Sequence, residues 1–217
     1  AVKRAKEQGS PALAITDSGV TYGLVEFYKE AKKAGIKPIL GMEAFVAPLG
    51  RHNKTPENRY SSLVLLAENN TGYQNLLKLA TLGALEGFYY KPRIDHELLQ
   101  LHGQGLIALS GSLHGVIPRA ILENQMEEAK NLILFYQSVF GKENFYLELQ
   151  HHPEIANWSI VNSKLMELAK ETGAPLVAGN DNHYLTPEDA EAHDVLICVK
   201  RKKNVKDEHR FKFVGDY

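Results

Sequence analysis

The chain has 217 residues, of which 44% are hydrophobic and 24% charged, an ordinary composition for a globular protein. Its formal net charge of −1 gives no global argument for binding to nucleic acid or membranes. The single cysteine, Cys198, excludes an internal disulfide framework, and no apolar run reaches the roughly 18 residues of a membrane span. We therefore expect a soluble, cytoplasmic protein of one large or two small domains.

Short apolar runs alternate with segments of helical period along most of the chain. The first residues, AVKRAKEQG, read as the back half of a helix that ends at Gly9. Strands are predicted at 12–17, 37–48, 62–69, 106–112, 145–150 and 175–181. Helices are predicted at 22–34, 72–85 with Thr71 as the cap, 117–122, 125–140, 155–171 and from 187 to about 199.

Three further segments have no clean period. Residues 51–59 are polar and read as an exposed loop. Residues 87–95, GFYYKPRID, combine aromatic and basic side chains, a composition that suits stacking on single-stranded nucleic acid or the covering of a barrel rim. The tail from 200 to 217 begins with Lys-Arg-Lys-Lys and reads as a connector, with contact to a DNA backbone as the alternative.

Six strands alternating with helices predict a parallel sheet covered by helices. No Gly-x-Gly-x-x-Gly turn follows any of these strands, which favours a barrel over a dinucleotide-binding fold. Functional residues of such barrels lie at the carboxyl ends of the strands. In this sequence those ends supply Asp17, Glu43, Ser112, Glu148 with His152, and Asp181 with His183.

The last predicted strand carries the clearest single motif. In PLVAGNDNHY the apolar run opens into Asp181 and His183, and the extended spacing of two would place both side chains on the same side of the chain. A carboxylate and an imidazole at one strand end suit a metal or phosphate site, although they also occur as the polar tip of a turn. Because other strand ends also supply acidic and imidazole groups, we favour the metal site.

Several segments, in order, resemble the PHP (polymerase and histidinol phosphatase) domain of bacterial DNA polymerase III alpha subunits. They are ALAITDSGV, GIKPILGMEAFVAP, LVLLAENNTGYQNLLKLAT, GFYYKPRID, LIALSGSLHGVIP, NFYLELQ and LVAGNDNHYLTPEDAEAHDVLICV. The resemblance covers nearly the whole chain. It implies an α/β fold, a distorted (β/α)7-type barrel, whose first strand would precede Ala1. It also implies a PHP domain over 1–199 and a connector toward the polymerase palm over 200–217.

Active PHP domains bind up to three metal ions, commonly zinc or manganese, and cleave phosphoesters. The resemblance carries over Glu43, Asp181 and His183 as residual metal ligands, with Asp17 and His152 nearby and His114 as a surrogate. Serine stands at three ligand positions, Ser18, Ser62 and Ser112, and the opening His-x-His motif would lie upstream of Ala1. A serine hydroxyl is a poor ligand beside imidazole or thiolate. Natural loss and deliberate substitution would both produce this pattern.

The resemblance therefore implies a DNA-directed DNA polymerase as the parent protein, with magnesium in its palm domain, and a PHP domain with a degenerate metal site. Its role would be structural, or docking onto DNA and other holoenzyme subunits such as the proofreading subunit, with no membrane partner. The alternative is a working metal-dependent phosphoesterase or 3′–5′ proofreading exonuclease. A free-standing histidinol-phosphate-type phosphatase matches the quoted segments less well.

Overall fold

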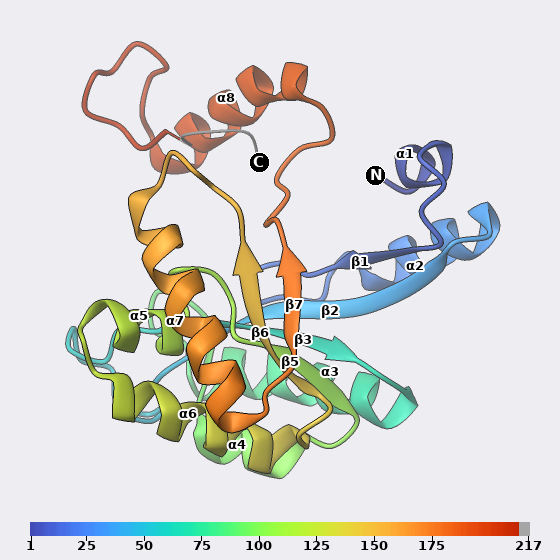
Figure 1. Cartoon of the computed structure of the whole chain (residues 1–217). Helices are drawn as coiled ribbons and strands as arrows, with labels where there is room; N and C mark the ends of the chain where they lie inside the picture. The colour runs from blue at the N-terminus through green and yellow to red at the C-terminus, as the bar shows by residue number, and fades with distance from the viewer. Residues whose placement is uncertain (213–217) are drawn as a thin grey trace.

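A curled sheet forms the centre of the molecule (Figure 1). The computed structural model describes residues 1–212. The main path of the sheet runs β1 (Ala12–Ile15), β2 (Lys37–Val46), β3 (Ser61–Ala67), β5 (Leu106–Leu109), β6 (Phe145–Gln150) and β7 (Leu176–Gly179), and β4 (Arg93–Ile94) pairs with the end of β2. In Figure 1 the β1–β2 ribbon crosses the direction of β6 and β7, so the sheet bends into half of a barrel.

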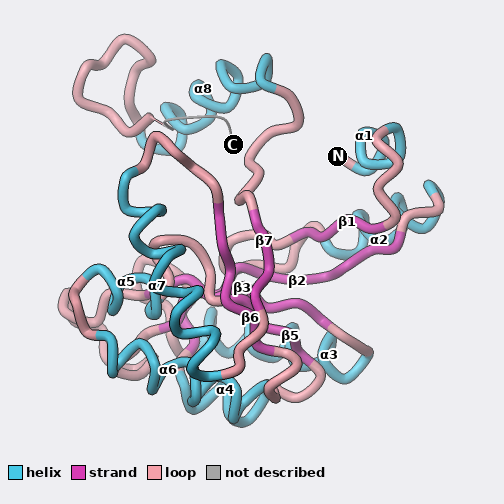
Figure 2. Tube along the Cα trace, viewed as in Figure 1, coloured by secondary structure: helices cyan, strands magenta, loops and turns pink. Residues whose placement is uncertain are grey.

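Helices cover the convex side of this sheet (Figure 2). They are α1 (Val2–Glu7), α2 (Leu24–Ala34), α3 (Asn70–Leu85), α4 (His96–His102), α5 (Val116–Leu122), α6 (Met126–Phe140) and α7 (Ala156–Thr172). A 3-10 turn, η1 (Pro187–Asp189), leads into α8 (Ala190–Arg201), which lies beyond the carboxyl ends of β6 and β7. None of the helices within residues 1–212 is long and apolar enough to cross a membrane.

One apolar core lies between the sheet and the helices. Alternate residues of β3, β5 and β6 point into it, as expected for half-buried strands. The helices α3, α6 and α7 add side chains at helical spacing. Typical members, all almost fully buried, are Leu63, Leu65, Leu76, Leu79, Leu106, Ile133, Phe145, Leu147, Val161 and Leu165.

The α/β class and the distorted barrel are confirmed, but the prediction of an all-parallel sheet is wrong. Strand β3 runs antiparallel to both of its neighbours, β2 and β5, whereas the other pairs are parallel. The connection from β2 to β3, residues 47–60, contains no helix, so the chain turns back instead of crossing over.

Local boundaries differ from the sequence prediction at three places. The cap of α3 is Asn69, whose side chain accepts a hydrogen bond from the backbone N–H of Gly72, and not Thr71. The segment without clean period contains β4 and is followed by α4, which the sequence did not predict. The last strand ends at Gly179, and α8 continues through Arg201 into the predicted connector. The connector beyond residue 212 lies outside the described residues.

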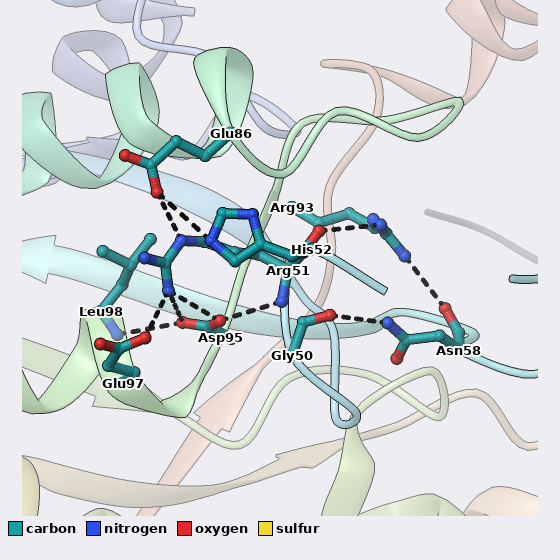
Figure 3. A network of polar contacts seen from close by, with 9 residues as sticks. All are labelled: Gly50, Arg51, His52, Asn58, Glu86, Arg93, Asp95, Glu97 and Leu98. Atoms are coloured by element: carbon teal, nitrogen blue, oxygen red, sulfur yellow. Dashed lines mark hydrogen bonds and ion pairs between the residues drawn. The ribbon is translucent and has the colours of Figure 1, made fainter. Parts of the chain in front are cut away.

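The predicted exposed loop at 51–59 is held by two buried arginines (Figure 3). Arg93 is 0% exposed, and its guanidinium donates hydrogen bonds of 3.0–3.2 Å to the backbone carbonyls of Gly87, Asn58, Arg51 and Asn53. Its side chain is therefore not available to an external ligand. For Arg93, this rules out the first of the two alternatives for residues 87–95, contact with single-stranded nucleic acid.

The second arginine, Arg51, is bound by carboxylates from three places in the chain. It donates to Glu86 at 2.6 Å, to Asp95 at 2.9 Å and to Glu97 at 2.8 Å. Burial alone would lower the pKa of Arg51, but the hydrogen bonds to these carboxylates outweigh it and raise the pKa above its usual range. Asp95 also caps α4 through the backbone N–H of Leu98. The loop is thereby tied to α3 and α4.

Replacing Arg93 by methionine should destabilise the fold, because four buried carbonyls then lose their donor while the bulk of the side chain is kept. We expect the free energy of unfolding to fall by about 3 kcal/mol, since hydrogen bonds to charged groups are worth roughly 1.5–3 kcal/mol. Arg93→Lys should recover only part of the loss, because an ammonium group lacks the planar fork. Urea unfolding followed by circular dichroism measures both.

The exposed Arg4 on α1 provides the matched control, and Arg4→Met should leave the unfolding midpoint almost unchanged. Equal effects at positions 4 and 93 would contradict a structural role for the buried guanidinium.

Candidate functional site

A cavity of about 510 Å³ opens at the carboxyl ends of β1, β2, β5, β6 and β7. We call it the mouth. It brings together most of the residues that the sequence predicts for the site. The polar residues that line it are Thr16, Asp17, Ser18, Glu43, Ser112, Glu148, Gln150, Asp181, Asn182 and His183. Ser62 instead lines an adjacent cleft that shares Glu43 with the mouth, and His152 lines a third, smaller cavity with His114.

Glu43 is positioned by an extension of the β1–β2 pairing beyond the end of β1. Its backbone N–H donates to the carbonyl of Asp17 at 3.1 Å, and its own carbonyl accepts from the N–H of Gly19 at 2.8 Å. This places Ser18 directly beside it, and the Ser18 hydroxyl donates to Glu43 Oε2 at 2.6 Å. One of the two carboxylate oxygens is therefore already engaged.

Asp181 and His183 also meet, but not in the predicted way. The backbone of Asp181 has φ of +43°, so the chain is not extended after β7 and the spacing argument for this pair is wrong. The side chains nevertheless approach, with His183 Nε2 3.4 Å from Asp181 Oδ2. The hydrogen bond to His183 is the main reason that the pKa of Asp181 lies below its usual range, with the charges of His183, His152 and His114 adding to it.

Glu148 is the residue whose environment the sequence did not reveal. It is 6% exposed, and Oε1 accepts from Gln150 Nε2 at 2.9 Å, whereas Oε2 has no hydrogen-bond partner among residues 1–212. Burial, reinforced by the negative charges of Asp181 and Glu43, raises the pKa of Glu148. The only signal in the sequence was that Glu148 lies near the end of the strand FYLELQ, on the face opposite Phe145 and Leu147.

Two of the three serines lie close to the backbone of His114. The N–H of Ser62 donates to the His114 carbonyl at 3.1 Å, and Ser112 Oγ accepts from the His114 N–H at 3.3 Å. The Ser62 hydroxyl is buried, and within the described chain it has no hydrogen-bond partner.

The donor set fits a resident metal ion poorly. In the described part of the chain, no group of three or more His, Cys, Asp or Glu side chains can converge on one ion. Ser18 engages Glu43, and Asp181 and His183 engage each other. A tightly held ion needs roughly three or four protein ligands. Within residues 1–212, Glu43, Asp181 and His183 do not make up such a set.

The charge of Glu148 predicts a pH-dependent stability. Its pKa is raised in the folded protein, so the folded state binds this proton more tightly than the unfolded state. This tighter proton binding stabilises the folded protein at low pH, and the stabilisation is lost as the pH rises through the folded pKa. We expect Glu148→Gln to be more stable than the parent near neutral and higher pH, by roughly 1–3 kcal/mol, and the difference to vanish toward about pH 4.

Urea unfolding of both proteins across this pH range measures the effect, with Glu154→Gln at an exposed position as control. A difference between parent and Glu148→Gln that is constant with pH would contradict the role given to burial.

Gly179 on β7 gives the Glu148 carboxylate its space. A Cβ atom at position 179 would lie 1.9 Å from Glu148 Oε1, so Gly179→Ala must displace the acidic side chain. We expect a loss of about 1–3 kcal/mol in the free energy of unfolding. The loss should be much smaller when Gly179→Ala is made in a Glu148→Ala background, because the clashing atoms are then absent. Additive effects in this double-mutant cycle would refute the contact.

Comparison with known proteins identifies the family of this chain. A DNA polymerase III subunit alpha from Borreliella burgdorferi is 46% identical over 214 residues, which cover 97% of this chain and 18% of that protein. The corresponding subunit from Thermus aquaticus is also 46% identical, over 210 residues that cover 95% of this chain and 17% of the relative. The chain thus spans less than a fifth of the length of these relatives.

A solved structure of an amidohydrolase from Chromobacterium violaceum shares the fold, with a TM-score of 0.50 and 16% identity over 88% of this chain and 89% of that one. At the level of sequence, the family model described as "PHP domain" matches residues 1–152, well over half of the chain. On that match, the chain belongs to the PHP domain family.

Proposed function

We propose that this chain is the PHP domain of a replicative DNA polymerase, a DNA polymerase III subunit alpha, and that it serves DNA replication as a structural and docking module. The observation that carries the proposal is the extent of the similarity to alpha subunits. Identity of 46% extends over 97% of the chain, beyond residue 152, where the match to the general family ends.

The metal site of this domain is proposed to be degenerate. Serine occupies positions 18, 62 and 112, and the three candidate ligands Glu43, Asp181 and His183 would hold zinc or manganese only weakly. The mouth geometry supports this view, because the Glu43 carboxylate accepts from Ser18 whereas Asp181 pairs with His183. The alternative of a phosphoesterase or 3′–5′ exonuclease is not favoured.

The parent polymerase supplies the expected partners. They are DNA, other subunits of the holoenzyme including a proofreading subunit, and magnesium in a palm domain outside this chain. We propose that the PHP domain ends near residue 199 and that the remainder connects to the polymerase. The described part of this connector folds back onto α8, since Arg210 forms a bidentate ion pair with Asp194 at 2.5 and 2.6 Å.

The decisive experiment uses the full-length protein that carries this chain. After purification with zinc and manganese, elemental analysis should find fewer than about one such ion per molecule. With nucleotides omitted, the protein should leave a mismatched 3′ primer end intact. With nucleotides and magnesium supplied, it should extend a matched primer. A bound cluster of two or three ions, or removal of the mismatch, would overturn the degenerate site, whereas failure to extend would overturn the polymerase assignment.

Restoring ligands tests the placement of the site. In the full-length protein, the triple variant Ser18→His, Ser62→His, Ser112→Cys should bind about one additional zinc ion, because imidazole and thiolate replace hydroxyl groups. The matched control introduces the same residue types at Ser10, Ser138 and Ser163, which lie outside the mouth. Equal zinc uptake by both variants would mean that the three serines do not mark a common site.

A further inference from the structure

The adjacent cleft, which we call the arginine cleft, is larger than the mouth. Its volume of about 720 Å³ falls within the roughly 300–1,000 Å³ that is usual for ligand sites. Glu43 is the one carboxylate among its described lining residues, against four arginines, namely Arg59, Arg93, Arg119 and Arg201. The cleft is therefore strongly cationic, although the chain as a whole carries a net charge of −1.

The walls of the cleft are fixed before any ligand arrives. Arg93 donates to the carbonyls of Asn53, Asn58 and Gly87, and Asn58 itself lines the cleft. Figure 3 shows the bond to Asn58. Arg119 donates to the carbonyl of Tyr60 at 3.2 Å, which orients its guanidinium at the cleft. A preformed site loses less conformational entropy on binding. The other cations of the cleft are Arg59, Arg119 and Arg201, and the Arg201 guanidinium also lies over the Phe211 ring at 4.4 Å.

Aromatic rings accompany these cations. Tyr90 is 82% exposed at the cleft and stands at φ of +58°, an uncommon conformation for a bulky residue, at the tip of a tight turn closed by Tyr89 and Lys91. The turn thus presents the ring to solvent at a cost in backbone strain. Tyr60 also lines the cleft, where it packs against Phe45 at 4.7 Å and remains partly exposed.

Cationic groups and exposed aromatic rings in one preformed cleft match the two halves of a nucleotide. A planar guanidinium binds phosphate oxygens through paired hydrogen bonds, and a tyrosine ring stacks on any base. The Tyr90 ring contacts Tyr89 edge to face and is 82% exposed, so a flat base can still stack on it, whereas an acidic peptide would use only the arginines.

We infer that the arginine cleft binds a nucleotide unit, either free or within single-stranded DNA. The base stacks on Tyr60 or Tyr90, and the phosphate is met by Arg59, Arg119 and Arg201. This inference goes beyond the proposed function, because it rests on the residues of the cleft and requires neither a metal ion nor the polymerase activity.

The test uses full-length protein and a short oligothymidylate that carries 5-iododeoxyuridine. Ultraviolet cross-linking followed by peptide mass spectrometry locates the adducts, so that DNA bound elsewhere on a polymerase does not obscure the result. We expect adducts in the peptides that contain Tyr60, Tyr89 or Tyr90. Tyr90→Ala and Arg59→Ala should each raise the oligonucleotide concentration at which these adducts reach half of their maximum by roughly fivefold or more. Tyr90→Phe should leave this concentration unchanged.

Exposed residues outside the cleft provide the controls. Tyr22, 89% exposed before α2, and Arg4 on α1 are replaced by alanine and should leave the cleft adducts unchanged. Competition identifies the source of the nucleotide unit. Displacement by thymidine monophosphate supports a free nucleotide, and displacement only by longer single strands supports DNA. Absence of adducts from the cleft peptides, equal competition by duplex DNA, or equal competition by polyglutamate would overturn the inference.

Discussion

A fully buried guanidinium is the constraint on which this half of the barrel depends. A cation without water or a counter-ion is costly in a protein interior, and Arg93 meets that cost with a shell of backbone carbonyls. Those carbonyls come from a long loop and from the turn before β4, so the arginine can be satisfied only when both are in place. Arg51 adds carboxylates from α3 and the start of α4. The same contacts therefore hold in place both the loop that follows β2 and the wall of the arginine cleft.

The mouth handles its negative charge in three different ways. Glu43 is stabilised by a hydroxyl donor from Ser18, Asp181 by the imidazole of His183, and Glu148 by a raised pKa that favours its neutral form. The serine at position 18 thus supplies one of these donors. A serine at a ligand position therefore still contributes to the polar network.

The sequence was sufficient for the periodic elements and insufficient where orientation or burial depends on distant residues. Strand β6 was predicted with its observed bounds, because FYLELQ is short, apolar and followed by polar residues. The direction of β3 was missed, since an apolar run reads the same in parallel and antiparallel sheets. Arg93 looked like a surface cation, because its carbonyl partners lie up to 42 residues away. The strand ends indicated Asp181 and His183, but the turn composition of Gly179 to Asn182 was given too little weight against an extended chain.

Glu43 lies where two cavities of opposite charge meet, and the charge of each cavity limits what the other can bind. It lines both the acidic mouth and the cationic cleft. A phosphate group bound by the arginines would face the carboxylates of the mouth, and unscreened like charges in a cavity of low dielectric repel strongly. The juxtaposition of the cationic cleft and the acidic mouth therefore favours a nucleotide held in the cleft over one drawn into the mouth.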